Sequence, residues 1–368
     1  MAKSRLHQLS EHGQSVWIDF LSRDLLRSGE LERKMREDAV VGVTSNPTIF
    51  QKAISAGHAY DEQLREVLEE ERDPKEVFIR LAAKDISDAL ALLRPVWDGG
   101  SGRDGYVSME VDPNLAYDTG ATIEEAQRLH DLIDRPNLFV KIPATKPGLP
   151  AIEEMIARGR SINVTLTFSL DRYVEVAQAY ISGLERLVED GGDPSRVASV
   201  ASFFVSRVDT EADRRLDEIG GHDGLKGKLA VANAKLAYQR YKEIFSGERW
   251  EPLGAKGATP QRCLWASTST KNPAYSDVLY VENLIGPMTV NTMPEETIAA
   301  FQDHGRVAPT LEQGIDEAKR LFDELADAGV DYNQVTETLE REGVEKFADS
   351  FGELLEGIRA KSGQLAAA

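Results

Sequence analysis

LFVKIP (residues 138–143) and SINVTLTF (161–168) are the stretches from which the fold of this chain can be predicted. Each is a short apolar run that ends in polar residues, as a strand buried on both faces does. Six similar runs occur along the chain: VWIDF (16–20), AVVGVTSN (39–46), YVSMEV (106–111), VASVASFFV (197–205), CLWAST (263–268) and MTVNT (288–292). The segments between the runs have helical periodicity, so the sequence predicts strands that alternate with helices.

Two of the intervening segments illustrate the helical pattern. Apolar residues recur at helical spacing over 122–134, where Thr122 and Glu125 form a capping-box pattern, and again over 169–190. The G-x-G-x-x-G match at 100–105 comes before a strand, which is the wrong order for a dinucleotide site, so we expect a loop there. Eight such units without a dinucleotide fingerprint favour an α/β fold of the closed (β/α)8 TIM-barrel type over a doubly wound sheet.

We expect residues 1–368 to form a single domain built on this barrel, with extra helices at both ends. The strands would occupy approximately 16–293, and C-terminal helices would fill 294–368. Charged residues and glycines are dense in 52–105 and 209–261, so we interpret these two segments as insertions.

The segment after the last strand contains two candidate helices, 311–328 and 333–360. Glycine is the residue that most often ends a helix, because it adopts a left-handed conformation without strain. Gly329 and Gly343 are therefore candidate breaks in this segment.

The composition is that of a globular protein, with 368 residues, 41% of them hydrophobic and 29% charged. No apolar stretch approaches the roughly 18 residues that span a bilayer, and the first residues lack a signal-peptide pattern, so we expect a cytoplasmic protein without a membrane partner. Cys263 is the only cysteine, which leaves no intrachain disulfide. The net charge of −19 opposes nucleic-acid binding, and a phosphorylated substrate would need a few local cations to capture it.

Four charged residues lie in or just after the predicted strands: Asp19, Glu110, Lys141 and Arg207. Burying an ionised group without partners costs several kcal/mol, so each of these residues must pair or have a function. All four lie toward the carboxyl ends of their strands, which is where barrel enzymes place their active sites. Alternation along 161–168 also directs Asn163, Thr165 and Thr167 to one face, which we expect to be the barrel interior.

A lysine inside such a barrel has a chemical use. Burial disfavours the ammonium form, and the neutral amine is a nucleophile that can attack a ketone to form an imine. Two carboxylates nearby can move the protons that imine formation and carbon–carbon cleavage require. The alternative is a purely structural ion pair of Lys141 with Glu110 or with Asp19.

The sequence predicts neither a metal nor another cofactor. All six histidines fall outside the eight predicted strands, and no pair has metal-ligand spacing at a strand end. We therefore expect a cofactor-free enzyme. The sequence does not distinguish a monomer from a homodimer.

Motifs at the ends of the predicted strands match those of a known family. WIDF, VTSNPTIF, VSMEVDPNLAYD, FVKIPAT, INVTLTFS and SFFVSRVD resemble, in order and spacing, the corresponding motifs of transaldolases. The resemblance covers all eight predicted strands, and the combination is specific although no single motif is. The length suggests a bacterial subfamily with long chains. The resemblance implies phosphosugar substrates. It also implies the transfer of a dihydroxyacetone unit from sedoheptulose 7-phosphate to glyceraldehyde 3-phosphate, a step of the pentose phosphate pathway.

The resemblance also implies a role for individual residues. Lys141 would form the Schiff base, Glu110 would activate the water of imine chemistry, and Asp19 would be the acid/base of carbon–carbon cleavage. The remaining implied residues bind substrate: Asn46 and Thr165 position hydroxyls and the water, Ser202 lines the dihydroxyacetone pocket, and Arg207, Ser267 and Lys271 hold phosphate. The spacing in ASTSTKN departs from the commoner short form of the motif, which makes Lys271 the less secure assignment.

Two other readings remain open from sequence. A fructose 6-phosphate aldolase shares the barrel and the lysine, but it has a shorter chain and carries Gln in place of Glu110 and Tyr in place of Phe204. A non-catalytic barrel that only binds phosphosugars would need no lysine beside two carboxylates.

Overall fold

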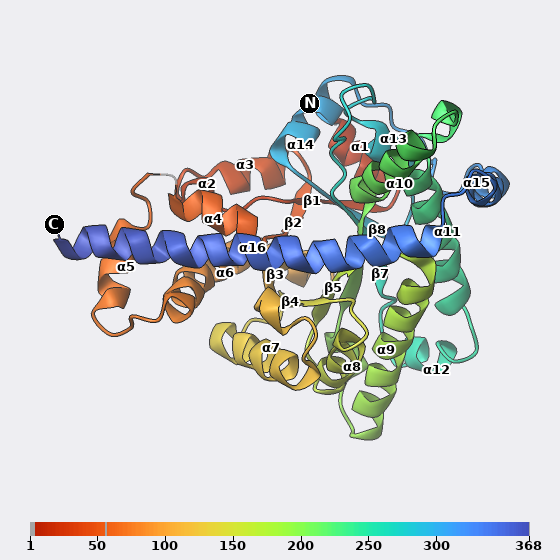
Figure 1. The fold of residues 1–368 in the computed structure, drawn as a ribbon. Coiled ribbons are helices and arrows are strands. Elements are labelled where there is room, and N and C mark those ends of the chain that lie inside the picture. The colour runs from red at the N-terminus through yellow and green to blue at the C-terminus, as the bar shows by residue number, and fades with distance from the viewer. Residues whose placement is uncertain (1–3, 56, 368) are drawn as a thin grey trace.

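In the described part of the chain, eight parallel strands form a closed barrel at the centre of the molecule (Figure 1). The computed structural model describes residues 4–55 and 57–367. The strands are β1 Gln14–Ile18, β2 Val40–Val43, β3 Val107–Glu110, β4 Leu138–Pro143, β5 Ile162–Thr167, β6 Ser199–Phe204, β7 Arg262–Ala266 and β8 Thr289–Met293. Each strand pairs with the next, and β8 pairs with β1. All eight predicted strands are present, and the prediction of a TIM barrel is confirmed.

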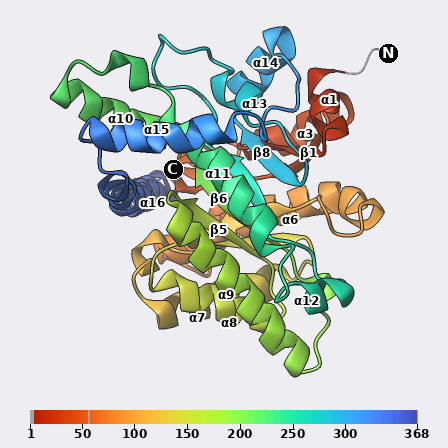
Figure 2. The ribbon, with the colours of Figure 1, turned by 90° about the vertical axis from the view of Figure 1, so that its right-hand side faces the viewer.

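Helices surround the barrel and connect successive strands (Figure 2). The α-helices are α1 Arg5–Glu11, α2 Arg23–Arg27, α3 Glu30–Glu37, α4 Pro47–Ser55, α5 Asp61–Leu68, α6 Pro74–Gly99, α7 Thr119–Ile133, α8 Gly148–Ala157, α9 Leu170–Glu189, α10 Val205–Ile219, α11 Leu229–Ile244, α12 Glu251–Ala255, α13 Leu279–Asn283, α14 Glu295–His304, α15 Ile315–Asp327 and α16 Tyr332–Ala367. The described residues also form three short 3-10 helices, η1 Pro113–Leu115, η2 Pro194–Arg196 and η3 Asp223–Leu225. The extra helices predicted at the two ends are α1 and the group α14 to α16.

Two sequence interpretations of these helices are corrected. The segments 52–105 and 209–261 are not simply insertions, because α6 packs on β2 and β3 and α11 packs on β7 as connecting helices of the barrel do. The charged residues on the outer faces of these helices give the two segments the composition of an insertion. The capping box is also wrong: α7 begins earlier, with Asp118 accepting a hydrogen bond from the amide of Ala121. The loop predicted at 100–105 is present.

The amino end of the barrel is closed by a charged cluster. Arg262, the first residue of β7, pairs with Asp104 at 3.0 Å and donates to the hydroxyl of Ser15 at 2.9 Å. Asp104 also accepts from the indole of Trp17 at 3.0 Å. Charges at this end of a barrel contribute to stability rather than to catalysis. Among the residues that the structure describes, no helix is long and apolar enough to cross a membrane.

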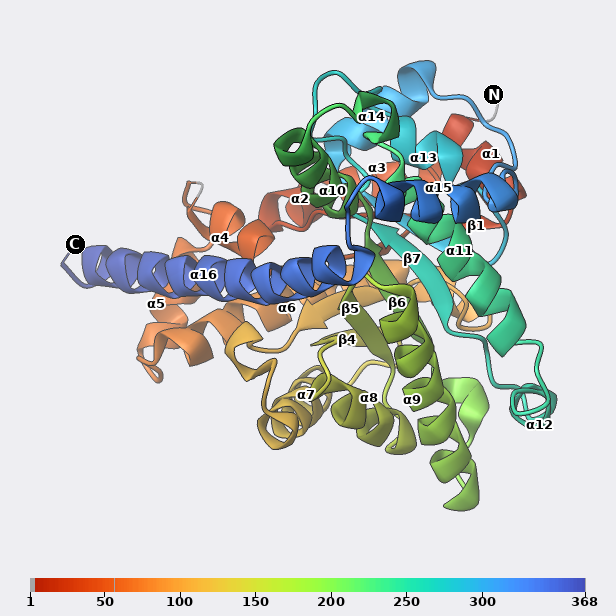
Figure 3. The ribbon, with the colours of Figure 1, turned by 45° about the vertical axis from the view of Figure 1, so that its right-hand side comes forward.

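The last helix, α16, runs across the molecule in front of the strands (Figures 1 and 3). It contacts α4, η1 and α10, which follow the carboxyl ends of β2, β3 and β6, and it contacts β5 directly. One face of the helix is therefore buried on the end of the barrel where an active site is expected.

One predicted break in the C-terminal region is confirmed and the other is wrong. Gly329, with φ of +94°, lies between α15 and α16. Gly343 lies inside α16, where a Cβ atom would come within 3.0 Å of the Leu166 side chain. Leu166 itself has φ of 57°, and the pairing of β5 with β6 shifts between Val164 and Thr167. Gly343 therefore serves close packing of the helix on this bulge instead of ending it.

Candidate active site

A cavity of about 300 Å³ opens at the carboxyl ends of the barrel strands. Its wall includes eight of the nine predicted site residues: Asp19, Asn46, Lys141, Thr165, Ser202, Arg207, Ser267 and Lys271. They come from segments far apart in the sequence, and the barrel brings them together. The ninth, Glu110, is a neighbour of this wall rather than part of it.

Lys141 lies in the middle of β4 with its side chain in the barrel. It is 5% exposed, and its amine donates a 2.8 Å hydrogen bond to the carbonyl of Ser45. In the sheet it pairs with Glu110 of β3 and with Asn163 of β5. The amine thus reaches the cavity while strands with polar residues flank it on both sides.

Glu110 is held close to Lys141 without a hydrogen bond to it. Both carboxylate oxygens are buried and accept no hydrogen bond within the described residues. Burial raises the pKa of Glu110 to about 7, although the positive charges of Lys141 and Arg207 oppose the rise. A carboxyl group of this kind can hold or release a proton near neutral pH, as a general acid/base must.

Asp19 follows the end of β1 and has a fixed orientation. Its amide donates to the carbonyl of Met293 at 2.9 Å, and its carboxylate accepts a 2.6 Å hydrogen bond from the hydroxyl of Thr44. The Thr44 hydroxyl also lies 2.7 Å from that of Thr292. Burial raises the pKa of Asp19, and the charge of Lys141 opposes that rise. Among the described residues the structural ion pair considered from sequence is not formed, because Lys141 donates its hydrogen bond to Ser45 and Asp19 accepts one from Thr44.

A polar network lines the interior below the lysine. The amide of Asn163 donates to the hydroxyl of Ser108 at 3.0 Å, and the hydroxyl of Ser202 donates to the Asn163 carbonyl oxygen at 2.7 Å. The Thr165 hydroxyl is buried and has no partner among the described residues. Asn46 accepts a 3.0 Å hydrogen bond from the amide of Ile49, so it shapes the first turn of α4 and also lines the cavity.

Basic and hydroxyl groups gather at another part of the wall. Arg207 lies in the first turn of α10, and one of its terminal nitrogens is buried without a partner in the described chain. Among the described residues Arg207 forms no ion pair with the nearby Asp209, which accepts hydrogen bonds from the amide of Ala230 and the hydroxyl of Tyr280. The Ser267 hydroxyl lies 2.9 Å from that of Ser206, which directly precedes Arg207.

Lys271 also lines the cavity, but it is exposed and donates a 2.7 Å hydrogen bond to Ser269. Ser269 was not predicted, although it lies in the same ASTSTKN segment. Thr48 and Lys52 were also missed, and their position beside Asn46 was the available signal. Phe347 lines the cavity from α16 and had no such signal in the sequence.

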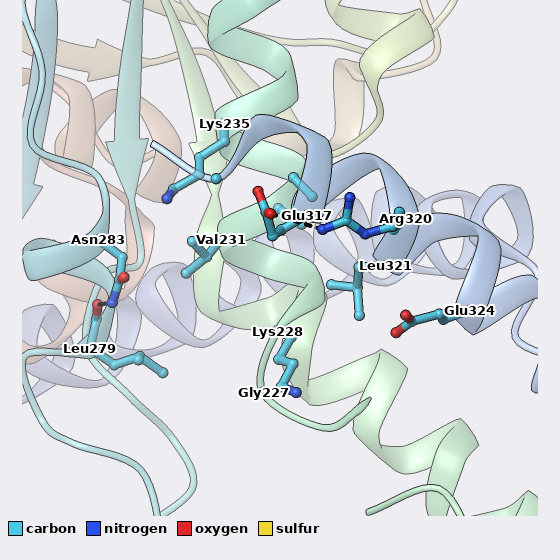
Figure 4. A pocket seen from close by; sticks show the side chains of 13 residues that line it. Gly227, Lys228, Val231, Lys235, Leu279, Asn283, Glu317, Arg320, Leu321 and Glu324 are labelled. Carbon is cyan, nitrogen blue, oxygen red and sulfur yellow. Dashed lines mark hydrogen bonds and ion pairs between the residues drawn. The ribbon is translucent and has the colours of Figure 1, made fainter. Parts of the chain in front are cut away.

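A second hollow, of about 470 Å³, lies on the outside of the barrel between α11 and α15 (Figure 4). Its apolar floor includes Val231 and Leu321, and Glu317 pairs with Arg320 on one side. None of the predicted site residues lines it. In the part of the chain that the structure describes, no group of three or more His, Cys, Asp or Glu residues could hold a metal ion.

The sequence model of the transaldolase/fructose-6-phosphate aldolase family matches residues 16–358. The chain belongs to this family. Among proteins to which it is similar, the transaldolase of Frankia alni is 53% identical over 362 residues, which are 98% of each chain. The transaldolase of Acidothermus cellulolyticus is 54% identical over 355 residues, covering 96% of this chain and 95% of that protein. A protein named transaldolase 2 from Streptomyces coelicolor is 49% identical over 364 residues, 98% of each chain.

The comparisons agree with the fold and the cavity on the kind of protein. Members of the transaldolase/fructose-6-phosphate aldolase family act on phosphosugars, and the curated relatives are enzymes of the transferase class. The family and an enzyme of this class were predicted from the sequence, and both predictions are confirmed. The predicted transaldolase activity agrees with the names of relatives that match nearly the full length.

Proposed function

We propose that this chain is a transaldolase that transfers a dihydroxyacetone unit through a Schiff base on Lys141. The donor would be sedoheptulose 7-phosphate and the acceptor glyceraldehyde 3-phosphate, giving erythrose 4-phosphate and fructose 6-phosphate. The observation that carries the proposal is the position of Lys141, whose amine borders the cavity with Asp19 in the same wall and Glu110 on the adjacent strand.

The first half of the reaction makes the imine. The Lys141 amine adds to the ketone carbon, and the resulting carbinolamine loses water as a proton reaches its hydroxyl oxygen. Glu110 is suited to supply that proton through a water molecule, because its buried carboxyl group titrates near neutral pH. The same group can take a proton from water when the imine is later hydrolysed.

The second half breaks and remakes a carbon–carbon bond. Asp19 accepts the proton of the hydroxyl next to the bond that breaks, an aldose phosphate leaves, and the bonding electrons pass to the iminium nitrogen as an enamine forms. The enamine then adds to the aldehyde carbon of the acceptor, and Asp19 returns the proton to the new hydroxyl. The hydrogen bond from Thr44 keeps Asp19 oriented for both transfers.

The remaining wall residues hold the substrate. Asn46, Thr165 and Ser202 offer polar groups to the sugar hydroxyls and to the catalytic water. Arg207, Ser267 and Lys271 offer a planar cation, a hydroxyl and an ammonium to the terminal phosphate, which is the set of groups that phosphate prefers. Arg207 and Lys271 would be the local cations that a phosphorylated substrate needs in a protein with a net charge of −19.

Trapping with borohydride tests this proposal. Incubation with fructose 6-phosphate and borohydride should add one reduced dihydroxyacetone unit to the peptide that contains Lys141, as mass mapping would show. Lys141→Arg keeps the positive charge and should form no adduct and show no transfer. An adduct on another lysine, or none in the wild type, would refute the assignment. Release of free dihydroxyacetone without an acceptor, at a rate comparable with transfer, would favour the aldolase alternative.

A further inference from the structure

One side chain from the described part of α16 reaches the cavity wall. Phe347 is buried, and its ring meets that of Phe204 edge-on, with the ring centroids 6.0 Å apart and the planes at 66°. The carbon atom at the centre of the Arg207 guanidinium lies 5.0 Å from the centroid of Phe204 and 5.7 Å from that of Phe347. The guanidinium therefore rests on two aromatic rings, one from β6 and one from the C-terminal helix.

Contact with aromatic rings and an ion pair leave the Arg207 guanidinium differently able to bind a ligand. A carboxylate partner would occupy the N–H donors of Arg207, whereas an aromatic ring attracts the cation through its face and leaves those donors available. One terminal nitrogen of Arg207 is buried without a partner among the described residues. The rings thus contact a cation that, within the described chain, keeps a buried nitrogen free to donate to an anion.

The position of Phe347 is specific to this site, as the next aromatic residue of the helix shows. Phe351, one turn further along, is also buried, but its ring packs against Phe78 at 5.7 Å, and it does not line the cavity. Gly343, one turn before Phe347, lets the helix approach Leu166 closely. Phe347 thus lies one turn along the same helix from this close contact with the barrel.

We propose that Phe347 is a positioning residue for the substrate phosphate: together with Phe204 it holds the Arg207 guanidinium in the orientation that meets the phosphate. The C-terminal helix would then set the preference of the enzyme for phosphorylated over unphosphorylated sugars. This inference rests on the proposed function for the identity of the anion.

The test compares Phe347→Leu with the matched variant Phe351→Leu. Steady-state kinetics with fructose 6-phosphate and with unphosphorylated fructose as donors separate phosphate recognition from the chemistry. Phe347→Leu should raise KM for fructose 6-phosphate about 3- to 10-fold with kcat nearly unchanged, and should leave kcat/KM for fructose unaltered. Phe351→Leu should leave the ratio of the two donors as in the wild type. Phe347→Tyr, which keeps the ring, should restore KM.

Equilibrium binding of inorganic phosphate, measured by calorimetry, gives a readout that needs no catalysis. Its dissociation constant should rise in Phe347→Leu by the same 3- to 10-fold factor and remain unchanged in Phe351→Leu. Equal losses for both donors, or equal behaviour of the two leucine variants, would overturn the inference. If the wild type forms no borohydride adduct the proposed function fails, and the phosphate measurement still decides the role of Phe347.

Discussion

Glu110 and Lys141 are directly paired across β3 and β4, yet the carboxylate of Glu110 accepts no hydrogen bond from the lysine or from any other described residue. The Lys141 amine donates to the Ser45 carbonyl instead. A buried carboxyl group without hydrogen bonds favours its neutral form, and this explains why the pKa of Glu110 lies at about 7. The pairing places the proposed proton carrier on the strand next to that of the lysine without an ion pair between the two groups.

The first prediction is that Glu110→Gln makes the protein more stable at alkaline pH. The ordinary pKa of 4.5 applies in the unfolded chain and about 7 in the folded one, so the folded state loses stability as the pH rises through this interval. The difference corresponds to about 3 kcal/mol at pH 8, before relaxation of the site reduces it. The melting temperature of Glu110→Gln should therefore exceed that of the wild type at pH 8 but not at pH 5. A gain of equal size at both pH values would contradict this account.

The second prediction separates the two carboxylates. Asp19→Asn should still form the imine with fructose 6-phosphate but should fail to release glyceraldehyde 3-phosphate, because the proposed role of Asp19 is in carbon–carbon cleavage. Glu110→Gln should slow both formation and hydrolysis of the imine. Removing a positioned acid/base costs about 10²- to 10⁴-fold in rate. Single-turnover kinetics with borohydride quenching measure the steps separately, and equal defects in both steps for both variants would indicate a pair that shares protons.

Much of this site could be predicted because the barrel imposes a pattern on the sequence. The β4 run LFVKIP is apolar apart from one charge, so Lys141 stands out, and strand order brings the other strand ends to the same place. The roles of Asn46, Ser267 and Lys271 came from family resemblance, since a turn asparagine or a loop lysine carries no such signal alone.

The rest could not be predicted because it depends on packing between distant segments. Phe347 lies on a helix whose apolar stripe looks like any core-facing stripe, and only the path of α16 places it on Arg207. Gly343 resembles a helix end in sequence. The glycine is there because the helix packs closely on the bulge at Leu166, and that residue is far away in the sequence. Arg262 lies just before the apolar run 263–268, and its partners Asp104 and Ser15 come from distant segments, so the sequence did not predict its buried cluster.

The third prediction concerns Arg207 and Lys271, the two cations proposed to hold the substrate phosphate. Arg207→Lys keeps the charge but loses the planar pair of donors, so KM for fructose 6-phosphate should rise about 10- to 100-fold. Lys271→Ala should change KM less than about 5-fold, because exposed charges are screened by water. Comparing phosphorylated and unphosphorylated donors assigns each loss to the phosphate. A larger effect at Lys271 than at Arg207 would reverse the assignment.

The fourth prediction is that activity survives prolonged treatment with EDTA. The proposed steps use the amine of Lys141 and two carboxylates, and none of them needs a Lewis acid. Activity should be measured after dialysis against the chelator and again after adding back zinc or magnesium. A loss that the metal restores would show that the reaction follows another course.

The last prediction tests how closely α16 must approach the barrel, using two glycines of that helix. A Cβ atom at Gly343 would lie 3.0 Å from the Leu166 side chain, whereas one at Gly352 would meet nothing within 4 Å. Both positions gain helix propensity when glycine is replaced by valine, by a few tenths of a kcal/mol. At Gly343 the branched side chain must also displace Leu166, and overpacking of this kind costs about 1–3 kcal/mol.

Gly343→Val should therefore lower the melting temperature, and Gly352→Val should leave it unchanged or raise it slightly. Because Phe347 lies one turn beyond Gly343, Gly343→Val should also raise KM for fructose 6-phosphate, whereas Gly352→Val should not. Calorimetry and steady-state kinetics on the pair measure both effects. If the two variants are equally stable and equally active, the contact of α16 with Leu166 does not determine the position of the helix, and the reach of Phe347 over the cavity must be set by its other contacts.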